Sequence, residues 1–249
     1  MKKFFSRIDK IFFFSLLKII YQKYLIYKKK RYLQNFSSFK TYNYTSKKNE
    51  FSALCEKYLT DKGGLKESFG TRNFHFYSLF YNEYFQNKKK IINLIFECGI
   101  GTTDKKIQSN IAEKGKKPGA SLRVLRDYFQ NAHIYAADID KNILFEDIRI
   151  STMYVNQLDE RSIDEMWKKI NRENFDLIID DGLHTLKSVY NLFDKSFSKL
   201  KPKGLYVIED VHISYLRQLS SKLQKFKPTI ISSDKKHNVD DYLLVIEKN

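Results

Sequence analysis

A short apolar run that ends in two adjacent carboxylates constrains the fold of this 249-residue chain more than any other feature. Residues 175–179 lead into Asp180 and Asp181, and Gly182 and His184 follow. An apolar run of this length is typical of a strand buried on both faces, as in a parallel sheet. Ligands of open α/β sheets bind outside the carboxyl ends of the strands, where these aspartates fall. An aspartate can instead cap the helix that follows a strand, but the pair with its glycine and histidine fits a reaction site better.

Strand and helix patterns alternate from residue 91 to the end of the chain, as they do in a doubly wound sheet. We therefore expect an α/β, Rossmann-like sheet of seven strands, whose last two pair as an antiparallel edge. The domain would span residues 91–249, preceded by a helical segment over 51–90 that covers the cleft and a basic aromatic extension over 1–50. The expected strands are residues 91–98, 134–137, 152–155, 175–179, 205–208, 229–231 and 242–247, and the expected helices lie near 120–129, 163–170, 189–200 and 215–223.

Most of the net charge of +16 comes from the first 50 residues, which contain 13 Lys and Arg against Asp9 and Glu50, a balance of +11. The other 32 basic and 27 acidic residues balance at +5, so the charge does not point to a nucleic-acid partner for the domain. The apolar run 11–17 is interrupted by Lys18 and is too short to span a bilayer, and no signal-type cleavage site follows it. We expect residues 1–35 to form a basic aromatic helix that contacts an anionic membrane, a partner protein, its own domain or a second copy of the chain in a homo-oligomer.

The segment between this helix and the alternating region carries few clear signals. Residues 36–50 show no periodicity and are interpreted as a linker. Residues 51–87 are expected to be helical with a break at 61–64, and the aromatic segment 69–77 is expected to cap a cleft or fill a core. Four histidines are expected to have surface or packing roles, namely His75, His133, His212 and His237.

Cysteine content bears on the cellular compartment. Cys55 and Cys98 are too few for a disulfide framework, and Cys98 lies inside an apolar run. We expect both thiols to be reduced and buried, as in a cytoplasmic protein. The basic N-terminal segment makes the inner face of the membrane a second expected location.

The first expected strand ends in a glycine-rich turn next to an acidic residue. Glu97 is followed by Gly99 and Gly101, and glycine lets the backbone approach a ligand more closely than any residue with a Cβ. A lone GxG is common to many nucleotide sites. Asp138 closes the second strand, where a ribose diol would lie. No glycine-rich P-loop with a following lysine is present, which argues against an NTPase.

With these elements in place, the chain resembles the class I S-adenosylmethionine-dependent methyltransferases over roughly residues 65 to 249. Four motifs resemble a bacterial subfamily that includes the metal-dependent sugar O-methyltransferases of macrolide biosynthesis and the cephalosporin-hydroxylase-like proteins. These motifs are Gly119-Ala120-Ser121-Leu122-Arg123, Asp138-Ile139-Asp140, Asp180-Asp181-Gly182-Leu183-His184 and Val207-Ile208-Glu209-Asp210. Phe69-Gly70-Thr71 resembles the pre-domain motif of the subfamily, although Arg72 stands where an acidic residue commonly follows the threonine.

The resemblance implies a role for each matching residue. His184 would be the general base, while Asp181 and Asp210 would hold a divalent metal, with Mg²⁺ the expected ion and Glu209 as a further metal-binding candidate beside them. Asp180 would support the strand end near S-adenosylmethionine, and Gln157 would lie near the adenine. The remaining cofactor-binding candidates are Glu97, Gly99 and Gly101 for the methionine part, Asp138 for the ribose, and Ser121.

These expectations combine into a metal-assisted O-methyltransferase acting on a sugar hydroxyl of a surface polysaccharide or glycosylated metabolite. A metal ion would polarise the hydroxyl and an imidazole would take its proton. Mg²⁺ favours oxygen ligands and often uses one or two carboxylates together with substrate and water. Two alternatives remain: a nucleic-acid methyltransferase that uses the basic N-terminal segment, and an inactive membrane-associated scaffold of the same fold.

Overall fold

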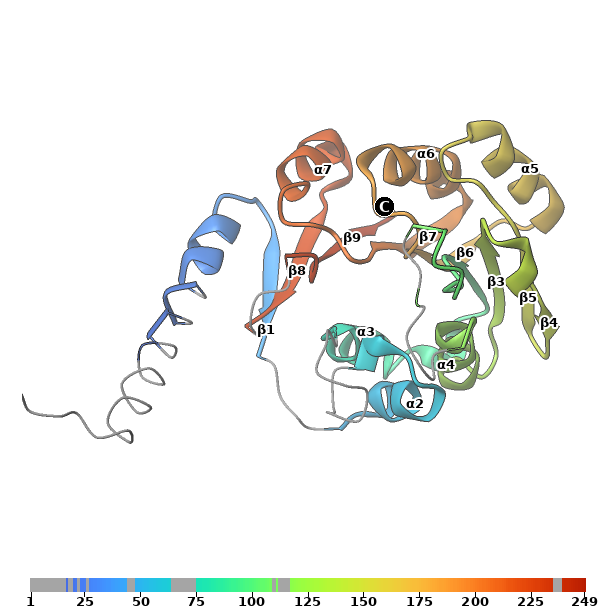
Figure 1. Ribbon diagram of the computed structural model, residues 1–249, viewed down its shortest axis with the longest axis horizontal. Helices are drawn as coiled ribbons and strands as arrows, with labels where there is room; N and C mark the ends of the chain where they lie inside the picture. The colour runs from blue at the N-terminus through green and yellow to red at the C-terminus, as the bar shows by residue number, and fades with distance from the viewer. Residues whose placement is uncertain are drawn as a thin grey trace, which may run out of the picture.

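The sheet has nine strands and confirms the expected doubly wound α/β class, although seven strands were expected (Figure 1). The computed structural model describes residues 17, 20–21, 23–25, 27–43, 48–63, 75–108, 111, 117–234 and 239–249. The strand order is β1-β8-β9-β7-β6-β2-β3-β5-β4, and the central block from β7 to β5 is parallel. The strands are β1 (Phe39–Tyr42), β2 (Leu94–Cys98), β3 (His133–Asp138), β4 (Glu146–Asp147), β5 (Ile150–Tyr154), β6 (Phe175–Asp180), β7 (Leu200–Ile208), β8 (Thr229–Ser233) and β9 (Leu243–Glu247).

One edge of the sheet differs from the expectation. β8 and β9 pair in antiparallel fashion, as expected, but β9 lies between β7 and β8, and β8 is covered in turn by β1. β1 lies in the part of the chain interpreted as a linker, so that interpretation is wrong for residues 39–42. Its register pairs Phe39 with Ile230, and the Thr41 and Ser232 hydroxyls lie 3.2 Å apart. The N-terminal extension therefore contributes a strand to the domain.

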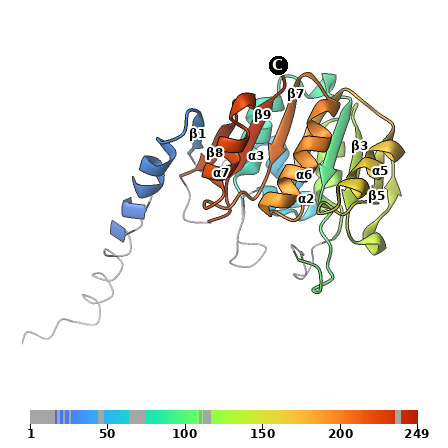
Figure 2. The same ribbon diagram turned by 90° about the horizontal axis from the view of Figure 1, so that it is seen from above.

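Helices cover both faces of the sheet in two layers (Figures 1 and 2). One layer contains α2 (Glu50–Tyr58), α3 (Tyr77–Phe85) and α4 (Ala120–Tyr128), and the other contains α5 (Glu160–Ile170), α6 (Leu186–Ser196) and α7 (Leu216–Lys222). Short 3₁₀ turns are η1 (Asp61–Gly63), η3 (Lys89–Ile91), η4 (Lys141–Ile143), η5 (Phe197–Lys199) and η6 (Gln224–Phe226).

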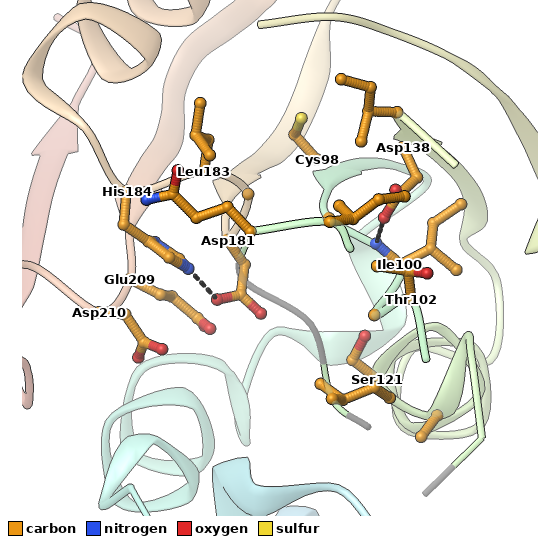
Figure 3. A pocket seen from close by; sticks show the side chains of 18 of the residues that line it. Cys98, Ile100, Thr102, Ser121, Asp138, Asp181, Leu183, His184, Glu209 and Asp210 are labelled. Atoms are coloured by element: carbon orange, nitrogen blue, oxygen red, sulfur yellow. Dashed lines mark hydrogen bonds and ion pairs between the residues drawn. The ribbon is translucent and has the colours of Figure 1, made fainter. Parts of the chain in front are cut away.

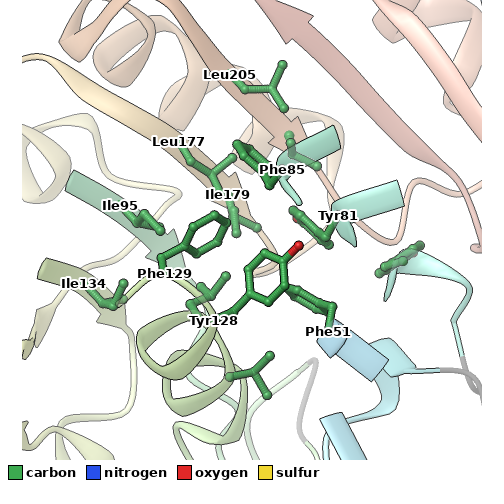
Figure 4. Packing of buried hydrophobic residues seen from close by; sticks show 14 of the residues in the cluster. Phe51, Tyr81, Phe85, Ile95, Tyr128, Phe129, Ile134, Leu177, Ile179 and Leu205 are labelled. Atoms are coloured by element: carbon green, nitrogen blue, oxygen red, sulfur yellow. The ribbon is translucent and has the colours of Figure 1, made fainter. Parts of the chain in front are cut away.

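Side chains of the central strands alternate between two hydrophobic cores, because successive residues of a strand point to opposite faces. Ile95, Ile179 and Val207 pack in the core beneath α2, α3 and α4 (Figure 4). Their neighbours Phe96 and Ile178 pack in the other core with α5 and α6. Burial on both faces explains the continuous apolar runs in the sequence.

The described part of the N-terminal helix, between residues 17 and 33, extends from the β1–β8 edge of the sheet (Figures 1 and 2). Leu33 is buried in the core on the α6 side, and the Lys29 ammonium donates a hydrogen bond to the Ser233 carbonyl at 3.0 Å. Among the described residues, no helix is long and apolar enough to cross a membrane.

Candidate functional site

A cavity of about 680 Å³ lies at the carboxyl ends of β2, β3, β6 and β7 (Figure 3). Its walls come from the loops after these strands and after β5, from the start of α4 and from η1. A parallel sheet brings the ends of these strands to one edge, where ligands of open α/β folds bind. Most of the expected site residues line this cavity: Gly99, Gly101, Ser121, Asp138, Gln157, Asp181, His184, Glu209 and Asp210.

In the described part of the chain, one cluster of side chains has ligand atoms suited to a metal ion. It consists of Asp181, His184 and Asp210. One such atom from each residue lies within 4.8 Å of the other two. Asp181 follows β6 and Asp210 lies just beyond β7, the parallel neighbour of β6, which explains why the two carboxylates converge. The His184 Nε2 atom lies 4.0 Å from Asp181 Oδ1 (Figure 3). All three side chains are partly exposed, so the cluster faces the cavity.

Helix capping does not explain these aspartates. α6 begins after Thr185, whose hydroxyl accepts from the Ser188 amide, and α7 begins six residues beyond Asp210 after the N-cap Tyr215. Two of the clustered residues also have left-handed backbone conformations, with φ of 57° at His184 and 49° at Asp210. Such conformations cost free energy in residues other than glycine and gather at functional sites.

The turn after β2 brings backbone close to the cluster. Gly99 has φ of 100°, and a Cβ there would lie 2.0 Å from the carbonyl oxygen of Asp181. Asp138 holds the same turn, since its two carboxylate oxygens accept from the amides of Ile100 at 2.7 Å and Asp140 at 2.9 Å. Asp138 is 8% exposed and its side chain borders the cavity, so it combines a structural role with access to a ligand.

Gln157 links the end of β6 to the loop that follows this strand. Its Nε2 atom donates to Asp180 Oδ1 at 2.7 Å, and its Oε1 atom accepts from the Leu183 amide at 2.8 Å. Asp180 lies behind the cavity wall, and burial raises its pKa to about 6. Asp180 thus supports the β6–α6 loop through Gln157, and its expected place near the cofactor stays a prediction.

A buried cation, Lys62, lies behind the cluster and was not singled out from the sequence. Its Nζ atom donates to Asp181 Oδ2 at 2.6 Å and to Glu209, and lies 3.6 Å from Glu97 Oε1. The Tyr81 hydroxyl donates to the second oxygen of Glu209 at 2.5 Å. Glu209, a metal candidate, is therefore held by Lys62 and Tyr81 and does not belong to the cluster of Asp181, His184 and Asp210.

Strand alternation explains why these carboxylates meet Lys62. Glu97, Asp181 and Glu209 each lie two residues beyond a strand residue that faces α2 and α3, so their side chains point to the same layer. Burial raises the pKa of Glu97 to about 7, against the opposing effect of Lys62. Burial disfavours the charge of Lys62 as well, but its carboxylate neighbours outweigh burial and raise its pKa. The ammonium is thus the counter-ion of two buried carboxylates, Glu97 and Glu209, and of the partly exposed Asp181.

His75 and Tyr77 hold Asp210 from the opposite side. The Tyr77 hydroxyl donates to Asp210 Oδ1 at 2.6 Å and accepts from the Asp210 amide at 3.0 Å. His75 Nδ1 lies 3.1 Å from Asp241 Oδ1 and 3.6 Å from Asp210 Oδ1. A surface or packing role was expected for His75. The imidazole is buried and stacks on the Tyr77 ring, which excludes a surface role and agrees with packing, but it also borders the cavity.

The sequence held a signal for this part of the site. Thr60-Asp61-Lys62 has an acidic residue after a threonine, the feature that Phe69-Gly70-Thr71-Arg72 lacks, and all three of its residues line the cavity. Residues 64–74 lie outside the described part of the chain, so the motif placed at 69–72 stays a prediction. Only His75, Phe76 and Tyr77 of the aromatic segment are described.

His75 gives the protein a pH dependence at alkaline pH. Burial disfavours its charge, but Asp210 and the hydrogen-bonded Asp241 outweigh burial and raise its pKa from 6.5 to about 10. A raised pKa means that the folded state keeps a proton that the unfolded chain has lost, so stability falls as the pH rises from about 6.5 to about 10. We expect urea unfolding in metal-free buffer to show this fall between pH 8 and 10, and His75→Gln to flatten it. His133→Gln, at the amino end of β3, is the control. An unchanged slope in His75→Gln would contradict the assignment.

The fold is that of the class I S-adenosylmethionine-dependent methyltransferases. The MycE methyltransferase of the mycinamycin biosynthetic pathway, solved in complex with Mg and SAH, superposes with a TM-score of 0.58 at 24% identity, over 82% of this chain and 56% of MycE.

Within that class, the chain is similar to sugar O-methyltransferases, which confirms the resemblance seen in the sequence. Demethylmacrocin O-methyltransferase of Streptomyces fradiae is 31% identical over 171 residues, 69% of this chain and 38% of the relative. The 8-demethyl-8-alpha-L-rhamnosyl tetracenomycin-C 2'-O-methyltransferase of Streptomyces olivaceus is 30% identical over 164 residues, 66% of this chain and 38% of the relative. The chain thus spans less than two fifths of these curated relatives. No protein-family model matches the sequence.

Proposed function

We propose that this protein is an S-adenosylmethionine-dependent O-methyltransferase that methylates a sugar hydroxyl with the help of a divalent cation, with Mg²⁺ the ion best suited. The observation that carries the proposal is the convergence of Asp181, His184 and Asp210 beside the glycine turn after β2. The similar sugar O-methyltransferases support the reaction type, and the Mg and SAH bound to MycE support the cofactor pair.

The cavity offers a place for S-adenosylmethionine next to this cluster. Gly99 and Gly101 line the cavity where the methionine part would lie, and Asp138 and Gln157 border it where ribose and adenine would lie. Glu97 lies behind the wall, and among the described residues neither of its carboxylate oxygens has a hydrogen-bond partner. The sulfonium is already an activated methyl donor, so the donor itself needs only alignment with the acceptor.

The donor set fits Mg²⁺, which prefers carboxylate oxygens and keeps positions for substrate and water. Asp181 and Asp210 would hold the ion, and Glu209 is a further ligand if its contact with Lys62 opens. When bound, the ion would supply Lewis acidity that eases ionisation of the sugar hydroxyl. His184 would accept the hydroxyl proton, with Asp181 oriented to stabilise the resulting imidazolium. Tyr77 and His75 would keep Asp210 in place.

We propose a sugar of a surface polysaccharide or of a glycosylated metabolite as the acceptor. One similar enzyme is named for 2'-O-methyl transfer to a rhamnosyl tetracenomycin, and another for O-methyl transfer to demethylmacrocin. We also propose that residues 1–35 make a contact outside the domain, because the described part of this segment carries exposed apolar and basic side chains. A cytoplasmic location, and one at the inner face of the membrane, are both compatible with this proposal.

Binding of the cofactor is the direct test. We expect titration calorimetry to detect S-adenosylmethionine binding, and Asp138→Asn to weaken it roughly 10- to 100-fold, because a charged hydrogen bond is worth about 1.5–3 kcal/mol. Asp164→Asn, an exposed aspartate of α5, is the matched control and should bind as the parent does. Absence of heat with the parent protein at high concentration would refute the proposed function, while equal affinity in Asp138→Asn would refute only its ribose role.

A further inference from the structure

The described part of the N-terminal helix exposes a row of large apolar side chains. Five of them recur at spacings of three and four residues and so lie along one helix face. Their exposed fractions range from 44% to 61%, which is high for such residues. We call this row the interfacial face: Leu17, Ile20, Tyr21, Tyr24 and Tyr27.

The orientation of the helix is fixed by its contacts with the domain. Lys29 is buried, donates to the Ser233 carbonyl and lies 4.7 Å above the ring of Tyr242. Leu33 is buried one turn further on. At about 100° per residue these two positions are roughly 120° or more around the helix from Tyr24 and Tyr27. The interfacial face therefore points away from the domain that the helix packs against.

Basic side chains accompany the interfacial face. Lys23, Lys28, Lys30 and Arg31 are exposed, the Lys28 ammonium lies 4.9 Å from the Tyr24 ring centroid, and the Arg31 guanidinium lies 5.9 Å from that of Tyr27. Apolar and tyrosine side chains bordered by lysine and arginine suit the boundary between lipid headgroups and acyl chains. We propose that the interfacial face binds the surface of a bilayer that contains anionic phospholipid.

Charge and side-chain chemistry favour this partner over two others. A second copy of the chain would bring the same cations together. The first 50 residues of each chain carry a balance of +11, and like charges repel. A nucleic acid would use aromatic rings for stacking, but Leu17 and Ile20 offer it no such surface. Anionic lipid satisfies the basic and the apolar side chains together, because each basic residue near such a surface contributes about 1 kcal/mol, roughly a fivefold gain in partitioning.

The test is co-sedimentation of the full chain with vesicles of phosphatidylcholine alone and with 30 mol% phosphatidylglycerol, at low and high salt. We expect binding to the anionic vesicles only, weakened at high salt. Lys23→Gln/Lys28→Gln/Lys30→Gln/Arg31→Gln should lower partitioning roughly 100-fold or more. Tyr21→Ser/Tyr24→Ser/Tyr27→Ser should lower it while leaving the charge unchanged. Lys168→Gln/Lys169→Gln/Arg172→Gln/Lys225→Gln removes equal charge from exposed residues elsewhere and should bind nearly as the parent does.

Three results would overturn the proposal. The first is no binding to anionic vesicles, and the second is an equal loss in the control variant, which would indicate adsorption by net charge alone. The third is weak vesicle binding together with either tight RNA binding or self-association in sedimentation velocity, provided that the tyrosine or lysine variants abolish that RNA binding or self-association. The substituted side chains are exposed, so circular dichroism should show an unchanged fold. None of these readings depends on methyl transfer, so they are independent of the proposed function.

Discussion

Lys62→Met is expected to destabilise the folded protein by about 3–5 kcal/mol, the range found when one partner of a buried ion pair is removed. The substitution keeps the length of the side chain but leaves Glu97, Asp181 and Glu209 without their shared counter-ion. Glu97 and Glu209 are almost completely buried, so water cannot replace the ammonium. The free energy of unfolding in urea measures the effect.

Two further measurements separate the counter-ion role from simple packing. Lys62→Met/Glu209→Gln removes one of the excess charges and should recover part of the lost stability. Mg²⁺ should also raise the melting temperature more in Lys62→Met than in the parent, since a bound cation then meets unpaired carboxylates. Lys57→Met on α2, where the ammonium is exposed beside Asp127, is the control. A loss no larger in Lys62→Met than in Lys57→Met would show that Lys62 is not the counter-ion of this site.

The sheet and the cluster at its edge were predictable because both depend on local patterns. Apolar runs at residues 175–179 and 205–208 mark buried strands, and the acidic residues directly after them fall at the carboxyl edge of any parallel sheet. The assignment of separate roles to Asp180 and Asp181 also follows a local rule. Ile178 and Ile179 face opposite cores, so the two aspartates face opposite sides as well.

The rest of the site depends on contacts between segments that lie far apart in sequence. Lys62 lies in a single 3₁₀ turn with no periodicity, and it meets Glu209 across 147 positions. His75 likewise reaches Asp241 across 166 positions. β1 has only four residues at the edge of the sheet, and its first two are exposed, so it shows no strand pattern. Such elements acquire their structure from tertiary pairing, which a one-dimensional pattern does not record.

His184→Gln is expected to lower the turnover of an accepted sugar by roughly 10²- to 10⁴-fold, the usual contribution of a positioned general base. Glutamine keeps a polar side chain of similar reach but cannot accept a proton at neutral pH. S-adenosylmethionine binding should be unchanged, because the residues proposed to face the cofactor follow β2, β3 and β5 while His184 follows β6. Steady-state rates, calorimetry and the pH–rate profile of both proteins together test the role.

The shape of the result distinguishes a base from a structural residue. Loss of the general base should lower kcat and remove the acid limb of the pH–rate profile, whereas loss of a merely supporting side chain would leave that limb in place. The His133 ring, at the amino end of β3, contacts Ser151 on the neighbouring β5. His133→Gln should therefore keep the rate of the parent. If His184→Gln lowers kcat less than tenfold with an unchanged profile, then the base is another group. His184 combines a left-handed backbone with a ring that lies 4.0 Å from Asp181 and borders the cavity. That outcome would leave its backbone strain without a catalytic reason.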